Sequence, residues 1–382
     1  MDIKNFEPLI KKLNEIGLEN HKIDDLSKIL IFSPLFDESG TFDPSKLQKC
    51  DSEGIKFSEI LARYLLIRAV LDQGPDMEGV RMFLEGVINS LYNLGIKFLH
   101  NPSDFFSNLE KVFLVVKDEH VKVKNKRGKI WAKNQNSERA NSYNLFLENS
   151  KQIPSYVMGR MGPPLAIIEI LKEKDEELLD LFKKQKSAET LSKFIKEDEF
   201  YGLGKTIGNK AAHLLLKWLI YTYGILESDK KEWTQNSYEL PLDSNAGRVL
   251  FMAGFFDPFL NSLDNPDEII GFEKEKDNNY YIYVTRAFRG KRAENIDESE
   301  AKDIKVKISK LFSSNIRSIQ VQWLINYLSE VTESTVGAID DGLMKIGTSY
   351  CINRGNQLCT TCEINMLCKS RSDQYRKAHY HT

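Results

Sequence analysis

Most of the chain carries the apolar spacing of α-helices. In residues 57–71, which read FSEILARYLLIRAVL, apolar side chains recur three and four positions apart, and the following DQGP is a helix-ending sequence. The same period continues in five further stretches, MEGVRMFLEGVINSLYNL from residue 77, PLAIIEILKEKDEELLDLFKK from 164, AAHLLLKWLIYTYG from 211, AGRVLFMAGFF from 246 and IRSIQVQWLINYLSEV from 316. These stretches predict an all-α protein.

Two segments depart from the helical period. After an Asn-Asn turn, Tyr281, Tyr283 and Thr285 alternate with Ile282 and Val284, which predicts a small β-hairpin inserted into the helical frame. The segment HVKVKNKRGKIWAKNQ, residues 120–135, is basic and contains one tryptophan, and we interpret it as a loop or a pair of strands.

The composition is that of a soluble globular protein. Of 382 residues, 41% are hydrophobic and 28% are charged. The 53 basic and 55 acidic residues give a net charge of −2, so nucleic-acid binding would have to come from local patches. No run reaches the roughly 18 apolar residues of a membrane span, and the N-terminus lacks an apolar leader core. We expect a cytoplasmic or nucleoid-associated monomer without a membrane partner.

Four of the five cysteines lie within residues 351–368. Cys351, Cys359, Cys362 and Cys368 have the spacing C-x7-C-x2-C-x5-C. Zinc sites usually pair two distant C-x2-C knuckles, whereas a [4Fe-4S] cluster needs four thiolates wrapped tightly around it. The spacing therefore favours a [4Fe-4S] cluster, with zinc as the alternative. We interpret Cys50 as a structural thiol.

This array resembles the cluster loop of the endonuclease III and adenine glycosylase branch of helix-hairpin-helix (HhH-GPD) DNA glycosylases, which reads C-x6-C-x2-C-x5-C. The approach GTSYC from Gly347 also resembles that loop, and the first gap here has one extra residue. The resemblance implies a cluster that supports a DNA-contacting loop and takes no part in base excision.

A second segment, FYGLGKTIGNKAAHLLLKWL, resembles the family's hairpin. The residues from Ile207 to Ala212 match its second half, which implies that Gly208 and Asn209 contact a DNA phosphate, and a glycine-bearing turn at a helix start suits this role. Lys210 then occupies the position of the Schiff-base lysine of the bifunctional members. An alternative register places Thr206 there. By itself, a lysine at a helix start is a solvated side chain.

A third segment, LPLDSNAGRVLFMAGFF, resembles the family's aspartate stretch. The resemblance places Asp243 at the catalytic aspartate, with Asn245 where the family has histidine. Asp243 also suits the N-cap of a helix beginning near Ala246, and the two roles are compatible. A carboxylate there would stabilise the positive charge that develops on the sugar as the glycosidic bond breaks.

Further residues suggest contacts with DNA. Gln73 follows the helix at 57–71, where the family's glutamine fills the gap left by a flipped base, although a polar helix end explains it equally well. Basic residues gather around Lys126 and Arg127 and again around Arg289. Such runs are usually solvated faces, but local patches of this kind could also hold phosphates.

The resemblance implies a fold of two helical subdomains with a C-terminal cluster loop. The expected segments are residues 1–55, packing with the C-terminal domain, residues 56–242, a helical barrel ending in the hairpin, and residues 243–382, carrying Asp243, the β-hairpin insertion and the cluster. Lys210 and Asp243 would face each other at the mouth of a DNA groove.

The implied function is base excision from double-stranded DNA that contains a damaged, mismatched or modified base. Lys210 would form a Schiff base with the sugar and allow β-elimination, which makes the enzyme a glycosylase with abasic-site lyase activity. Two alternatives stay open. A monofunctional glycosylase would use Asp243 to activate water and would not nick the strand, and a non-catalytic iron-sulfur protein would only bind nucleic acid.

Overall fold

The structure, a computed structural model, divides the chain into two compact units. It describes residues 3–71, 77–133, 153–226, 238–255, 318–351 and 358–368, and gives the backbone alone for residues 127–133, 153, 244, 248, 251 and 318–320. Unit 1 combines residues 1–22 with residues 235–382, and unit 2 comprises residues 23–234. The described residues form helices, turns and two isolated bridges, so the prediction of an all-α protein is confirmed for them.

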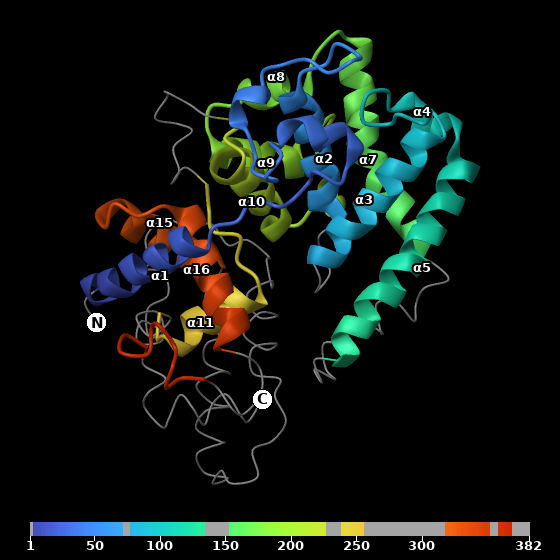
Figure 1. Cartoon of the computed structure of the whole chain (residues 1–382). Coiled ribbons are helices and arrows are strands. Elements are labelled where there is room, and N and C mark those ends of the chain that lie inside the picture. Colours follow the sequence, from blue (N-terminus) through green and yellow to red (C-terminus); the bar gives the residue numbers. More distant parts are fainter. Residues whose placement is uncertain are drawn as a thin grey trace. The chain divides into compact units, whose positions relative to one another are not determined.

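Helix α2 (Phe57–Leu71) forms the centre of unit 2, where it packs against neighbouring helices (Figure 1). Every residue from Phe57 to Val70 is buried. The buried charges of α2 therefore need partners from elsewhere in the chain. Arg63 Nε donates to Glu59 Oε1 at 2.7 Å, and Glu59 also accepts the backbone N–H groups of Leu178 and Leu179 at 2.9 Å each. The Glu59 carboxylate thus satisfies N–H groups at the start of α8.

The other helices that the structure describes in unit 2 are α3 (Met77–Asn93), α4 (Ser103–Ser107), α5 (Leu109–Lys133), α7 (Ile153–Glu173), α8 (Leu178–Lys183), α9 (Ala188–Glu197) and α10 (Asn209–Lys217), and α10 runs into a π-helical turn at Trp218–Thr222. Of these helices, α3, α7, α8 and α10 pack against α2, and α5 packs against α3 and α7. Helix α7 passes through Pro163 and Pro164. The Arg68 guanidinium of α2 lies 4.4 Å from the centre of the Trp218 ring, which ties α2 to the residue following α10.

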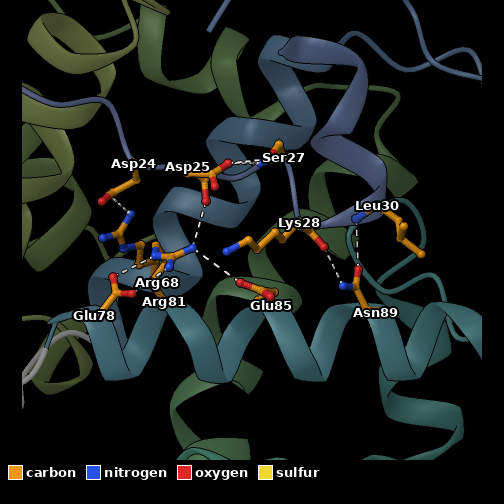
Figure 2. Close-up of polar contacts among 10 residues, drawn as sticks. All are labelled: Asp24, Asp25, Ser27, Lys28, Leu30, Arg68, Glu78, Arg81, Glu85 and Asn89. Atoms are coloured by element: carbon orange, nitrogen blue, oxygen red, sulfur yellow. Dashed lines mark hydrogen bonds and ion pairs between the residues drawn. The ribbon is translucent and has the colours of Figure 1, made fainter. Parts of the chain in front are cut away.

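Residues 23–55 cluster with unit 2, although the sequence grouped them with the C-terminal domain. Polar contacts explain this placement (Figure 2). Arg68 Nη1 donates to Asp24 Oδ2 at 2.6 Å, and Arg81 Nη1 donates to the carbonyl of Asp25 at 2.8 Å. Asn89 of α3 accepts the N–H of Leu30 at 3.0 Å. Three side chains on α2 and α3 therefore hold the segment that leads out of residue 22.

Unit 1 is built from both ends of the chain. Its described helices are α1 (Glu7–Asn20), α11 (Ser244–Met252), α15 (Ser318–Val331) and α16 (Val336–Ser349). Helix α1 packs along α16, and α16 also packs against α11. A contact between His21 Nδ1 and Asp341 Oδ2 at 2.8 Å joins residues 320 positions apart in sequence.

Glycines allow α1 and α16 to approach closely. A Cβ atom at Gly17 would lie 1.7 Å from the carbonyl oxygen of Ala338, and one at Gly342 would lie 2.1 Å from the carbonyl oxygen of Leu13. Both distances are far inside van der Waals contact. The two helices can therefore reach this separation only with glycine at these positions.

The helices differ from the sequence predictions in two respects. The basic segment from His120 was expected to be a loop or strands, but it is part of α5 as far as Lys133. This prediction was wrong because Val112, Val116, His120 and Val123 are buried at helical spacing, and that burial outweighs the local alternation of valine and lysine. The stretch predicted from residue 164 to 184 divides into α7 and α8, and Asp175 between them has a positive φ of 57°.

The β-hairpin expected around Tyr281 lies outside the residues that the structure describes. Within the residues that the structure does describe, no helix combines the length and the hydropathy needed to cross a membrane.

The close approach of α1 and α16 predicts a strong effect of Gly17→Ala. The added methyl group overlaps the Ala338 carbonyl, so we expect the free energy of unfolding to fall by about 1–3 kcal/mol or more. Thermal and denaturant unfolding would measure the change. Gly159→Ala is the matched control, because Gly159 is an exposed residue of α7 with open space around it. There the helix should gain roughly 0.5–1 kcal/mol. Equal effects of the two substitutions would contradict the packing argument.

Candidate functional site

Helices α9 and α10 form a hairpin around a tight glycine-bearing loop. The Asp198 side chain accepts the N–H groups of Phe200 and Tyr201 at 2.9 and 2.8 Å, and the N–H of Gly202 donates to the Asp198 carbonyl at 3.0 Å. A short 3-10 turn, Gly204–Thr206, follows, in which Gly204 adopts a positive φ of 52°. The loop is therefore ordered by its own hydrogen bonds.

Helix α10 begins without a side-chain cap. Gly208 is its extended N-cap residue, and the first helical hydrogen bond runs from the N–H of Ala212 to the carbonyl of Gly208 at 3.0 Å. Gly208 is exposed, its φ of −93° suits any residue, and nothing lies within 4 Å of the place where its Cβ would be. The fold itself thus does not demand glycine there, whereas a ligand approaching the first-turn N–H groups would benefit from the missing side chain.

Lys210 occupies the first turn of α10 and is half-buried. Thr206, the residue that the alternative register would put in its place, ends the preceding 3-10 turn and is outside the helix. Among the described residues, no carboxylate lies within ion-pair distance of Lys210 or of exposed Lys205. Lys196 of α9 donates to Asn209 Oδ1 at 2.5 Å. Lys205 and Lys210 therefore form no ion pair with the described part of the chain.

Arg160 of α7 adds a further cation that the sequence did not single out. Its guanidinium donates to the carbonyl of Thr206 and lies 5.1 Å from the ring centre of Tyr156, one turn earlier in α7. The one available sequence signal is a lone arginine four residues after a tyrosine in an otherwise uncharged stretch, residues 153–168. Such a pattern on its own does not distinguish a contact residue from a solvated arginine.

His213 lies inside the hairpin, one turn after Asn209. It is fully buried, and burial, with a smaller contribution from the charge of Lys196, lowers its pKa to about 3. The imidazole is therefore neutral at physiological pH. It belongs to the apolar support beneath the hairpin, together with Ala212 and Leu216.

Asp243 caps helix α11 in unit 1. Its Oδ1 accepts the backbone N–H groups of Asn245 and Ala246 at 2.8 Å each. The N-cap role expected from the sequence is therefore present. The other oxygen, Oδ2, has no hydrogen-bond partner within the described ranges. One oxygen of Asp243 thus fixes the side chain, and the second remains available.

The residues around Asp243 hold it from several directions. The chain from Tyr238 to Leu242 is buried apart from half-buried Glu239, and α15 secures it through Gln322 Nε2 to the Leu240 carbonyl at 2.6 Å. At the start of α11, a Cβ on Gly347 of α16 would lie 2.9 Å from Cβ of Asn245. Helix α16 therefore passes against the residue next but one to Asp243.

The four clustered cysteines lie beyond the C-terminal ends of α16 and α11. Cys351 follows α16, and its N–H donates to the carbonyl of Ile346 at 2.8 Å. Cys359 and Cys362 share a turn, in which the N–H of Cys362 donates to the Cys359 carbonyl at 3.3 Å. Cys368 Sγ donates to the carbonyl of Met252 at 3.5 Å. The segment that ends at Cys368 is thus attached to the last residue of α11.

Whether these cysteines suit a metal centre depends on their positions and on the chemistry of their sulfur atoms. In the described stretches, no three His, Cys, Asp or Glu side chains form a group that could hold a metal ion. Burial, the largest cause, raises the pKa of the Cys362 thiol to about 11. Four thiols without a carboxylate suit a soft metal or an iron-sulfur cluster. The donor chemistry fits the cluster, and residues 352–357 of the first gap lie outside the described residues.

The structure describes few of the other predicted DNA contacts. Lys126 is exposed on α5, and Lys122, one turn earlier, pairs with Glu119 at 2.5 Å. The structure describes neither Gln73 nor Arg289, and it gives only the backbone of Arg127. Lys210 belongs to unit 2 and Asp243 to unit 1.

Burial of neutral His213 predicts a pH dependence of stability. An unfolded histidine takes up a proton near the ordinary pKa of 6.5, whereas folded His213 does so only near 3. The unfolded state therefore binds more protons between these values, and the free energy of unfolding should fall as the pH drops from about 6.5 to about 3, by up to roughly 1.4 kcal/mol per pH unit. Denaturant unfolding at several pH values should show a shallower slope for His213→Gln. An unchanged slope would contradict the assignment.

The cysteine array predicts an iron-sulfur protein. After anaerobic purification we expect about four iron and four sulfide ions per chain, with the visible absorption of an iron-sulfur cluster. Cys362→Ser should lose most of the iron, because each cluster iron needs its own thiolate. Cys50→Ser is the matched control and should retain the iron, since Cys50 is exposed and far from the array in sequence. Stoichiometric zinc without iron would overturn the prediction.

Comparisons of the chain with protein-family models, with curated proteins and with solved structures found no match. The chemistry of the site must therefore be inferred from its own residues and their surroundings.

Proposed function

We propose that the protein binds double-stranded DNA and excises a damaged or modified base, with cleavage of the strand at the resulting abasic site. The observation that carries this proposal is the α9–α10 hairpin, in which Lys210 stands in the first turn of a helix that opens with exposed Gly208 and has no carboxylate partner among the described residues. The resemblance to helix-hairpin-helix DNA glycosylases gives the chemistry to which these residues are assigned.

The hairpin would hold a DNA phosphate. The first N–H groups of a helix have no partner within the helix, and the positive end of the helix dipole lies beside them. Gly208 leaves these groups accessible, and Lys205 adds a positive charge in the same loop. A phosphate bound here would place the adjoining nucleotide near Lys210.

Lys210 would act as the nucleophile. Its amine attacks C1′ of the sugar, and the bond between C1′ and the base breaks, with the base taking the bonding electrons and then a proton. Opening of the sugar ring then gives a Schiff base between C1′ and Nζ of Lys210. Loss of a C2′ proton breaks the C3′–oxygen bond and cuts the strand on the 3′ side of the lesion.

Asp243 would stabilise the positive charge that develops on the sugar. The two N–H groups bound to Oδ1 hold the side chain in one orientation, and Oδ2 would face the charge. The α11 N-terminus also favours the ionised carboxylate. The Asp243 side chain would therefore keep one orientation within unit 1 while the charge develops.

A [4Fe-4S] cluster would be held by Cys351, Cys359, Cys362 and Cys368. The cluster supplies structural cross-linking when bound, and Cys368 would connect it to the end of α11 through Met252. In the proposed reaction the residues that touch the sugar are Lys210 and Asp243.

Borohydride trapping tests the proposal without knowledge of the excised base. A duplex with an abasic site should form a covalent adduct with the wild-type protein when the Schiff base is reduced. Lys210→Gln should lose the adduct and the strand cleavage, by about 100-fold or more, while folding as the wild type does. Lys205→Gln is the matched control, because it removes a charge from the proposed phosphate site without removing the nucleophile, so at saturating protein it should still be trapped.

The outcomes distinguish the proposed activity from its alternatives. An undiminished adduct in Lys210→Gln would exclude Lys210 as the nucleophile. No wild-type adduct, with base release from damaged DNA, would indicate the monofunctional reaction in which Asp243 activates water. DNA binding with neither reaction would indicate a non-catalytic iron-sulfur binding protein.

A further inference from the structure

We infer that Arg160 and Tyr156 of α7 form a second DNA-contact site beside the hairpin, in which Arg160 binds a phosphate and Tyr156 stacks on a neighbouring sugar or base. This inference rests on one part of the proposed function, namely that DNA is the partner. It does not depend on catalysis by Lys210.

The position of Arg160 is fixed from two sides. One N–H of its guanidinium donates to the carbonyl of Thr206, two residues before Gly208. The guanidinium also lies 5.1 Å from the centre of the Tyr156 ring, which restricts its plane. The side chain is therefore already ordered against the hairpin loop, so little conformational entropy would be lost when it binds a ligand.

The charge of Arg160 is not balanced within the described residues. A guanidinium has five N–H donors, and the contact with Thr206 is to a neutral carbonyl. None of the carboxylates that the structure describes lies within ion-pair distance of it. The first 16 residues of α7, residues 153–168, include no acidic residue. The free N–H donors of this half-buried guanidinium would be satisfied by an anion with two or more oxygens, which can accept two parallel hydrogen bonds.

The surroundings favour the repeated phosphates of a nucleic acid over a single small anion. Lys205 and Lys210 lie in the same loop and helix start that Arg160 contacts through Thr206, and they too lack carboxylate partners among the described residues. Tyr156 is 43% exposed beside Arg160, and an exposed aromatic ring next to cations is typical of surfaces that stack on nucleotides.

Two other exposed surfaces, one on α5 and one at the hairpin tip, are less suited to binding DNA because acidic residues lie beside them. On α5, Lys122 already pairs with Glu119, and exposed Asp118 lies on the preceding turn. Exposed Phe200 at the hairpin tip follows three acidic residues, Glu197, Asp198 and Glu199. Arg160 and Tyr156 have no such negative neighbours along their helix, which is why the inference is assigned to them.

Fluorescence anisotropy with a short duplex that carries a tetrahydrofuran abasic analogue tests the inference, because this analogue does not react. Arg160→Gln should weaken binding about tenfold and reduce the slope of log Kd against log salt by about one. Arg160→Lys should restore the slope but only part of the affinity, since an ammonium lacks the planar fork. Lys172→Gln, at the other end of α7, is the matched control and should change neither value.

Tyr156→Ala provides a second variant, because Arg160 also supports the hairpin and its removal could loosen the fold. Tyr156 makes no hydrogen bond to the hairpin in the described residues, so Tyr156→Ala should fold normally and weaken binding about fivefold or more, whereas Tyr156→Phe should bind like the wild type. Circular dichroism and thermal unfolding would verify the folding of each variant.

The outcomes separate this inference from the proposed reaction. Wild-type affinity in both Arg160→Gln and Tyr156→Ala would overturn the contact site, whatever trapping shows. Absence of any DNA binding by the wild type would overturn the site and the proposed function together. If DNA binding depends on Arg160 but borohydride traps no adduct with the wild type, the contact site would be supported and the lyase reaction refuted.

Discussion

The buried carboxylate of Glu59 is the constraint on which unit 2 depends. It lies in the middle of a helix that is buried on all sides, and it is satisfied by Arg63 on the same helix and by two N–H groups that begin α8. Arg63 in turn donates to the carbonyl of Leu99 at 2.9 Å. Because removing one partner would leave a charge without compensation in the core, these distant segments must assemble around α2 together.

The same principle links the core of unit 2 to its candidate chemistry. Arg68, one turn from the end of α2, contacts Asp24 on one side and the Trp218 ring on the other. Trp218 follows α10 directly and begins the π-helical turn, so α10 is anchored at its C-terminal end while its N-terminal end carries Gly208 and Lys210. Anchoring of this kind would help to hold Lys210 in place for the proposed reaction.

The sequence predicted the helices better than the contacts between them. Burial of one face imposes a 3.6-residue period, so α2, α3 and α15 could be located from apolar spacing alone. At α5 the local alternation of valine and lysine led to a wrong prediction of strands or a loop. Val116 and Val123 are buried by tertiary packing, which cannot be deduced from the segment's own sequence. At the candidate site, the glycine-bearing turn indicated where Lys210 stands. Arg160 could not be predicted, since its contact with Thr206 spans 46 residues.

The pairing of α1 with α16 has a consequence for the order of synthesis. His21 and Asp341 are separated by 320 residues, and a ribosome that adds about 5–20 residues per second needs roughly 15 to 65 s to cover that distance. During this interval all of unit 2 leaves the exit tunnel, while the apolar face of α1, with Leu9, Ile10 and Leu13, still lacks the helix that covers it. While these 320 residues are synthesised, the nascent chain thus exposes the apolar face of α1, a surface to which chaperones would bind.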